Sequence, residues 1–216
     1  MQLLDLHTHR TSSYPEGIIC VEPRDVAVCT SSGQLCSVGL HPWYLSDSAE
    51  GVAQAAEELA KVATKPCVVA IGEAGFDTVR GGAMMLQTLA FRKQMEISEQ
   101  LGKPLIIHAV KTLDMIFSWR KESKAKQEWI IHGFRGKPQV AMQLLKSGCS
   151  FSFGEHFNAD TLRSLPDEAI FAETDESMLP ITEIINRISQ ERGKDMMPII
   201  ASNMMRLFPK QAELTL

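Results

Sequence analysis

The sequence predicts an α/β fold, namely a (β/α)8 barrel of the TIM type. Short apolar runs alternate along the chain with segments of helical periodicity, and this alternation favours parallel strands joined by helices. Eight such runs are present, which is the number of strands that closes this barrel. Because 216 residues suit one barrel, we expect a single domain over residues 1–216.

The predicted strands are short apolar runs that end at a polar or glycine-containing break. They are Leu3–Leu6, Ile18–Val21, Cys36–Leu40, Val68–Ile71, Leu105–Ile107, Trp129–Ile131, Ser150–Phe153 and Ile170–Ala172. Apolar residues at helical spacing predict helices over Ala49–Thr64, Met84–Leu101, Lys137–Ser147 and Ile181–Gly193. Gly102 and Pro104 stop the second helix, while Pro138 and Gly148 flank the third as helix termini prefer.

The start of the chain fits a regular barrel poorly. Only eleven residues separate Leu6 from Ile18, and they include Pro15 and Gly17, which is barely enough for a parallel crossover. We therefore expect the barrel to be shortened and irregular around its first helix and second strand, with that helix missing or degraded. The segment Val21–Leu35 is ambiguous between helix and loop.

Composition limits the classes of function. The net charge of −4 would repel nucleic acid and anionic membranes, so a phosphate substrate must be attracted locally, for example by a bound dication. The five cysteines form no C-x-x-C pair and indicate free thiols. Because neither a leader segment nor an apolar run of membrane-spanning length is seen, we expect a cytoplasmic protein without a membrane partner.

Ionisable side chains gather at the ends of the predicted strands. His7 and His9 end the first strand, and the later strands are followed by His41, Glu73, His108, His132, His156 and Asp175. The carboxyl ends of the strands of a parallel barrel open on one face, where active sites are built. We therefore expect these groups to converge at that face.

Each of these residues also has an ordinary interpretation. His7 and His9 share one face of an extended segment with Asp5, and they could simply be polar residues where a strand ends. His108 and His132 could be histidines at the edge of the core, and Asp175 could cap the next helix. Their coincidence on one rim instead favours a metal site, which needs imidazoles and carboxylates from different strands.

The donors are too numerous for one catalytic zinc, which usually takes three protein ligands. They are His7, His9, Glu73, His108, His132 and Asp175. We expect two divalent ions bridged by Glu73, with His7, His9 and Asp175 at one ion and His108 with His132 at the other. Imidazole suits Zn, Mn, Fe or Co better than Mg. Such a pair activates water for hydrolysis of a phosphodiester, with Asp175 as the candidate general base.

A set of motifs spans nearly the whole chain. They are "DLHTH" (Asp5–His9), "VGLHP" (Val38–Pro42), "IGEAGFD" (Ile71–Asp77), "FRKQMEISEQLGKPLIIH" (Phe91–His108), "IHGFRG" (Ile131–Gly136), "FSFG" (Phe151–Gly154), "ETD" (Glu173–Asp175) and "SNMMRLF" (Ser202–Phe208). Their order resembles the TatD family of metal-dependent hydrolases, which are barrel enzymes. The resemblance implies the same six metal ligands and places His41 near a substrate phosphate. It also implies a deoxyribonuclease acting on DNA ends, or a hydrolase of other esters such as aminoacyl-tRNA.

Two departures from the family pattern bear on the substrate. Val110 stands where family members commonly carry a basic residue, and Lys111 is the nearest replacement. Glu176 adds negative charge and Ser177 replaces the usual proline after "ETD". These changes weaken the case for a polyanion, so the expected substrate is a phosphodiester or another ester. No obligate protein partner is expected.

Several alternatives stay open. The start "DLHTHRTSS" also resembles PHP-domain phosphoesterases, and a degenerate barrel could serve as a non-catalytic binding module, although such a barrel should have lost a donor. Asp5 could orient an imidazole or bond to backbone. Trp43 and Tyr44 could stack on a base or pack within their loop. For His156 we favour a structural or rim role.

Overall fold

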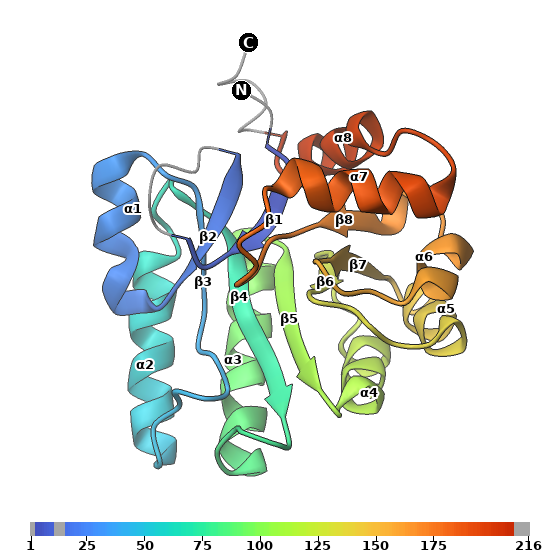
Figure 1. The fold of residues 1–216 in the computed structure, drawn as a ribbon. Coiled ribbons are helices and arrows are strands. Elements are labelled where there is room, and N and C mark those ends of the chain that lie inside the picture. The colour runs from blue at the N-terminus through green and yellow to red at the C-terminus, as the bar shows by residue number, and fades with distance from the viewer. Residues whose placement is uncertain (1–2, 11–15, 210–216) are drawn as a thin grey trace. The chain divides into compact units, whose positions relative to one another are not determined.

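The computed structural model describes residues 3–10 and 16–209 and has the predicted fold class (Figure 1). Its strands follow the order β1 to β8 of a closed barrel, and the pairs with a defined register are parallel. The strands are β1 Asp5–Thr8, β2 Gly17–Val21, β3 Cys36–Val38, β4 Val68–Asp77, β5 Leu105–Val110, β6 Trp129–Ile131, β7 Cys149–Phe153 and β8 Ile170–Ala172. The TIM-type barrel is therefore confirmed.

The helices include the four predicted ones and several that the sequence pattern did not indicate. The α-helices are α1 Val26–Ser32, α2 Ala49–Val62, α3 Met84–Leu101, α4 Leu113–Ser123, α5 Pro138–Lys146, α6 Ala159–Ser164, α7 Ile181–Arg192 and α8 Met197–Leu207. Two short 3-10 helices, η1 Pro23–Asp25 and η2 Asp167–Ala169, complete the set for the described residues. The ambiguous segment Val21–Leu35 thus contains η1 and α1.

The expected irregularity near the start is visible where the chain is described. The pairing of β1 with β2 shifts its register between Asp5 and Thr8. The missing or degraded first helix is predicted between these strands, and residues 11–15 of that segment lie outside the described residues.

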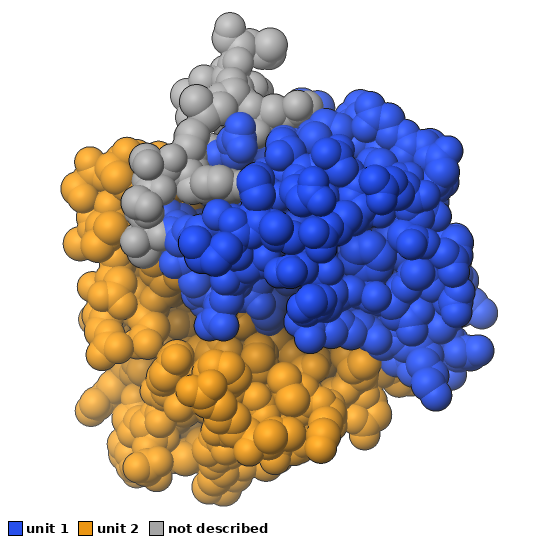
Figure 2. Space-filling model, in the orientation of Figure 1, with its two compact units in different colours: residues 1–19, 131–216 blue, residues 20–130 orange. Residues whose placement is uncertain are grey.

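The chain divides into two compact units, which Figure 2 distinguishes by colour. One consists of residues 1–19 and 131–216, and the other of residues 20–130. The single domain expected over residues 1–216 stays a prediction.

In residues 20–130, α2 packs against α3, and α3 packs against β4 (Figure 1). The apolar stripe of α2 buries Val52, Ala56 and Leu59, and burial of a side chain as large as that of Val52 or Leu59 is worth about 1.5–3 kcal/mol. The helix begins at Ser48, whose hydroxyl accepts a hydrogen bond from the backbone N–H of Gly51 at 3.0 Å. This packing covers the outer side of β4.

Strand β4 is longer than predicted, and this correction matters for the site. It continues beyond Ile71 to Asp77 and pairs with β5 through Gly75 and His108. A Cβ atom on Gly75 would lie 1.9 Å from the carbonyl oxygen of His108. Glycine therefore allows β5 to approach, instead of ending the strand as its sequence pattern indicated.

In residues 131–216 with 1–19, β8 pairs with both β1 and β7, and α7 and α8 pack beside β8 (Figure 1). The isoleucines of α7, which are Ile181, Ile184, Ile185 and Ile188, are all buried. Pro180 occupies the N-cap position of this helix. Asp175 is therefore not its cap, which removes the ordinary interpretation of that residue.

Candidate metal centre

Backbone pairing between the end of β1 and the segment after β8 brings three predicted ligands together. The N–H of Asp175 donates to the carbonyl of His7 at 2.9 Å, and the N–H of His9 donates to the carbonyl of Asp175 at 3.2 Å. The Oδ1 atom of Asp175 then lies 3.5 Å from Nε2 of His9 and 3.8 Å from Nε2 of His7. This oxygen therefore lies between two imidazole nitrogens.

His132 lies beside this group and is held by a buried carboxylate. Its ring centroid lies 4.6 Å from that of His7, and its Nδ1 lies 3.5 Å from Oε1 of Glu173. The N–H of Gly133 donates to the same oxygen at 2.6 Å. Gly133 has φ of 56°, a left-handed conformation that glycine adopts without a steric penalty. Burial alone would raise the pKa of Glu173. The hydrogen bond and charge of His132 and the charge of His7 lower it by a larger amount, so the pKa lies below its ordinary value.

Asp5 lies beneath these residues and bonds to backbone. Its carboxylate accepts hydrogen bonds from the N–H of His7 at 3.3 Å and from the N–H and hydroxyl of Thr174 at 2.9 and 2.7 Å. Burial raises the pKa of Asp5 to about 7. The sequence left two roles open for Asp5, and these bonds show that it bonds to the backbone.

We call His7, His9, His132, Glu173 and Asp175 the β1–β8 cluster.

In residues 20–130, β4 and β5 form a second group around Glu73, which is almost fully buried. Oε2 of Glu73 lies 3.1 Å from Nδ1 of His108, while Nε2 of His108 lies 3.4 Å from Oδ2 of Asp77. Glu73 and Asp77 share one face of β4 because alternate residues of a strand point the same way. We call His41, Glu73, Asp77 and His108 the β4–β5 cluster.

Asp77 is a strongly held carboxylate. It accepts hydrogen bonds from the indole N–H of Trp43 at 2.6 Å and from the backbone N–H groups of Val79 and Arg80 at 2.7 and 2.8 Å. Burial alone would raise the pKa of Asp77, but these donors and His108 lower it to about 2. An ionised Asp77 accepts the Nε2 proton of His108, which leaves Nδ1 of that ring as a lone pair facing Glu73.

The ring of His41 has its tautomer set by the backbone. The N–H of Trp43 donates to Nδ1 of His41 at 3.1 Å, so the neutral ring carries its proton on Nε2. That nitrogen lies 3.3 Å from Oε2 of Glu73. His41 is therefore suited to donate a hydrogen bond at the site, whereas His108 is suited to bind a cation.

Two further residues contact this cluster: Trp43 contacts Asp77, and Cys20 contacts Glu73. The guanidinium of Arg80 lies 3.8 Å from the centre of the Trp43 ring, so loop packing holds Trp43, while Tyr44 is exposed. The Cys20 thiol lies 3.7 Å from Oε1 of Glu73. Burial, followed by the charge of Glu73, raises the pKa of this thiol.

The donor atoms of both clusters suit a divalent metal ion. Within each of three groups, one ligand atom per residue lies within 4.8 Å of the others: His7 with His9 and Asp175, His132 with Glu173 and Asp175, and His41 with Glu73 and His108. Neutral imidazole with carboxylate is a common ligand set for Zn and related ions. Glu173 and Asp77 fix the second nitrogen of their histidines, as carboxylates beside metal-bound histidines do.

The structure thus places all six predicted ligands in these clusters. Four of them, His7, His9, His132 and Asp175, are in the β1–β8 cluster, and the other two, Glu73 and His108, are in the β4–β5 cluster. His156 is exposed and is in neither cluster. Sequence reasoning assigned no role to Asp77, Glu173 or Cys20. The alternation of strand residues could have identified two of them, since Asp77 follows Glu73 by four positions and Glu173 precedes Asp175 by two.

Comparisons with known proteins agree with the fold and these motifs. The family model described as "TatD related DNase" matches residues 23–208. The chain is 27% identical to the "3'-5' ssDNA/RNA exonuclease TatD" of Citrobacter rodentium over 77% of this chain and 72% of that protein. It is 30% identical to an "Uncharacterized metal-dependent hydrolase" of Buchnera aphidicola over 67% of this chain and 57% of that protein.

Solved structures share the barrel. That of YJJV, a TatD homolog from Escherichia coli, has a TM-score of 0.78 at 19% identity and covers 96% of this chain and 98% of that chain. The chain spans 64%, 57% and 61% of three curated relatives, from Danio rerio, Buchnera aphidicola and Haemophilus influenzae. Among residues 3–10 and 16–209, no helix combines the length and apolar character needed to cross a bilayer.

Proposed function

Because this chain belongs to the TatD-related DNase family, we propose that it hydrolyses phosphodiester bonds with two divalent metal ions, and that DNA ends are the first substrate class to test. The observation that carries the proposal is the donor set, because both clusters contain groups of three residues whose imidazole and carboxylate ligand atoms lie within 4.8 Å of one another. The cytoplasmic location and the absence of an obligate protein partner stay predictions.

The proposed centre joins the two clusters through Glu73. His7, His9 and Asp175 would hold one ion, His108 and His132 the other, and Glu73 would bridge them with its two oxygens. Support comes from the fold class, because the strands of a parallel barrel present their carboxyl ends on one face. When bound, divalent ions activate water and neutralise charge on a phosphate. Zn, Mn, Fe and Co suit these ligands better than Mg.

Two residues of the chain would act on the reacting groups. Asp175 would accept the proton of the attacking water, since its carboxylate is partly exposed and lies between His7 and His9. His41 would donate its Nε2 proton in a hydrogen bond to a phosphate oxygen, as the tautomer set by Trp43 allows. Both roles use atoms that remain available to the substrate, which are the carboxylate oxygens of Asp175 and Nε2 of His41.

A second candidate function is hydrolysis of a less anionic ester. Asp175 is followed by Glu176, and the hydroxyl of Ser177 donates to Glu155 at 2.7 Å, so carboxylates border the β1–β8 cluster. Val110 ends β5 without a positive charge. A small aminoacyl ester, which lacks a chain of phosphates, would tolerate this acidic border better than a long polyanion.

The experiment compares substrates with and without metal. Purified protein is stripped with a chelator, reloaded with Mn²⁺ or Zn²⁺, and offered 3'-labelled single-stranded DNA, a small phosphodiester and an aminoacyl ester. We expect end-trimming of DNA that stops with chelator and returns with metal. His132→Ala should abolish it, while the control His156→Ala, which changes an exposed histidine outside both clusters, should keep it.

The other outcomes are equally informative. Metal-dependent turnover of the aminoacyl ester alone would replace the first function by the second. Metal binding without turnover of any ester would favour a non-catalytic barrel. Turnover of DNA that survives both the chelator and His132→Ala would overturn the proposed centre.

A further inference from the structure

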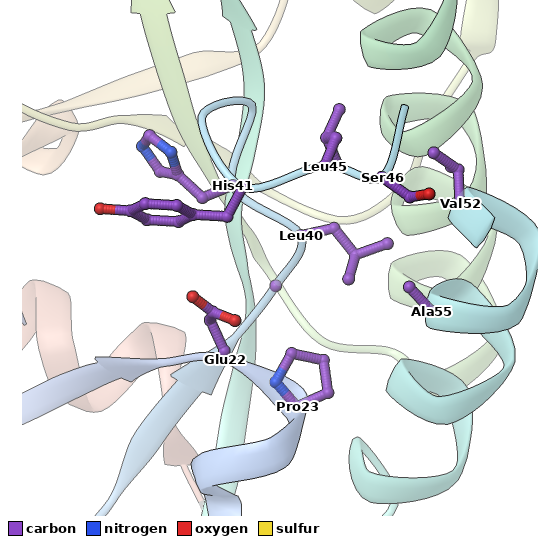
Figure 3. A pocket seen from close by; sticks show the side chains of 10 residues that line it. Glu22, Pro23, Leu40, His41, Leu45, Ser46, Val52 and Ala55 are labelled. Carbon is purple, nitrogen blue, oxygen red and sulfur yellow. The ribbon is translucent and has the colours of Figure 1, made fainter. Parts of the chain in front are cut away.

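A small pocket with a volume of about 40 Å³ opens beside His41 within residues 20–130. Figure 3 shows that its lining has two ends. Side chains of Leu45, Val52 and Ala55 form an apolar end, while Glu22 and His41 lie around the other. Tyr44 also lines the pocket. This volume is far below that of a site that encloses a whole ligand, so the pocket admits only one edge of a planar ring, and the rest of the ring would lie at the mouth.

Two residues that line the pocket, Gly39 and His41, lie close to Glu73 of the β4–β5 cluster. His41 lines it, and the Nε2 atom of this residue lies 3.3 Å from Oε2 of Glu73. Gly39 lines it as well, and a Cβ atom there would lie 2.7 Å from the carbonyl oxygen of Glu73. An occupant of the pocket would therefore lie beside the group that reacts at Glu73 and His41.

Tyr44 offers a flat surface at the mouth. Its side chain is 63% exposed, and its backbone N–H donates to the carbonyl of His41 at 3.1 Å, which anchors the residue beside that histidine. Exposed aromatic rings of this kind stack on bases, and each stacked base is worth about 1–3 kcal/mol. The ring thus favours a planar occupant over an aliphatic one.

Glu22 supplies an acceptor whose charge is already balanced. Its Oε2 pairs with the guanidinium of Arg24 at 3.0 Å, so the carboxylate has a cation beside it before any ligand enters. It remains able to accept a hydrogen bond from a neutral N–H group, because a carboxylate has several lone pairs. A carbonyl oxygen facing Glu22 would meet only another acceptor.

We propose that this pocket receives one edge of the nucleobase of the nucleotide being cleaved, while the rest of the base lies at the mouth, and that it prefers bases with an exocyclic amino group. Cytosine and adenine present such a group, whereas thymine presents a carbonyl oxygen and a methyl group in the corresponding position. Tyr44 stacks on the base, and Glu22 accepts a hydrogen bond from the amino group. The inference rests on the proposed phosphodiester hydrolysis and names the part of the substrate that this site selects.

The experiment measures kcat/KM of the metal-loaded enzyme on short oligonucleotides that differ in one nucleotide, which is dC, dT or an abasic residue at the cleaved end. We expect dC to exceed dT by about 10- to 150-fold, which is the factor that one hydrogen bond with a charged acceptor supplies. Glu22→Gln should bring dC and dT close together, because an amide can donate as well as accept. The control Glu58→Gln, an exposed carboxylate of α2, should leave the preference unchanged.

Tyr44 gives an independent measurement. Tyr44→Ala should lower kcat/KM for dC and dT by about tenfold, as loss of one stacked base predicts, and should leave the abasic substrate unaffected. Tyr44→Phe should behave as the wild type. Equal kcat/KM for all three substrates, or a dC preference that survives Glu22→Gln, would overturn the proposal.

Failure of the proposed function can be separated from failure of this inference. If no oligonucleotide is cleaved, binding of deoxycytidine and thymidine is measured directly by NMR line broadening. Tighter binding of deoxycytidine that is lost in Glu22→Gln would support the pocket assignment without any turnover. Absence of binding by either nucleoside, or an effect of Glu22→Gln confined to aminoacyl esters, would overturn it.

Discussion

Oε2 of Glu73 lies 3.1 Å from Nδ1 of His108, because the long strand β4 pairs with β5 through the glycine that follows Glu73 by two positions. The second nitrogen of His108 faces Asp77, four residues further along the same face of β4. One strand therefore carries both the carboxylate expected to bind metal and the carboxylate that orients its histidine.

Asp77→Asn should weaken metal binding without removing a ligand. The amide has no negative charge and holds the His108 ring less firmly, so the affinity for Zn²⁺ should fall by about 10–100-fold. A competition titration against a chromophoric chelator measures this. The matched control is Asp47→Asn, which removes an exposed carboxylate, and an equal loss in that variant would show that Asp77 has no specific role.

Asp175→Asn tests proton transfer. Without a base, kcat should fall by about 10²–10⁴-fold, while KM changes little because the other ligands still hold the site. Steady-state kinetics with metal content measured in parallel separates this from loss of an ion. If kcat is retained in a fully metal-loaded variant, Asp175 is not the base.

The close approach of β5 to β4 depends on Gly75. A Cβ at this position would lie 1.9 Å from the carbonyl oxygen of His108, so Gly75→Ala should lower the free energy of unfolding by about 1–3 kcal/mol. Gly82→Ala is the control, since nothing lies within 4 Å of a Cβ there. Urea denaturation measures the free energy of unfolding of both variants. Equal values would show that β5 can move away from β4 to accommodate the added Cβ without loss of stability.

Asp167 predicts how stability depends on pH. The ammonium of Lys194, followed by Arg192, lowers the pKa of this carboxyl below its ordinary value of 3.8 despite its partial burial. A lowered folded-state pKa means that the ionised form is favoured in the folded state, so its contribution is present above pH 3.8 and is lost as pH falls through the folded value.

Asp167→Asn should therefore destabilise the protein at neutral pH, and the difference from the wild type should shrink below about pH 3.8. Denaturation midpoints of chelator-treated protein at about pH 7, 5 and 3 measure the trend. A difference that stays constant with pH would show that the charge of the Asp167 carboxylate does not contribute to stability.

Most strands and the longer amphipathic helices were predictable because burial imposes a period on the sequence. α2 and α7 each bury a regular stripe, such as Val52, Ala56 and Leu59 in α2. α4 was not predicted because Ile116 is its one buried residue, so burial imposes little periodicity on its sequence. α6 is only six residues long, too short for a period to be visible.

The candidate ligands were predictable because each one ends or follows a strand. Their supports were less visible, because the role of a carboxylate such as Glu173 depends on a contact with His132, a residue of another strand. The end of β4 was placed too early, at Ile71, because glycine usually interrupts strands. Here Gly75 serves a close approach between strands instead.

The measurement that tests the central claim most directly is the number of divalent ions bound per chain, determined by native mass spectrometry after chelation and reloading with Zn²⁺. The proposed centre predicts two ions in the wild type and fewer than two in Glu73→Gln, because the bridging carboxylate has lost its charge. No bound ion in the wild type, or two ions retained by Glu73→Gln with unchanged affinity, would contradict it.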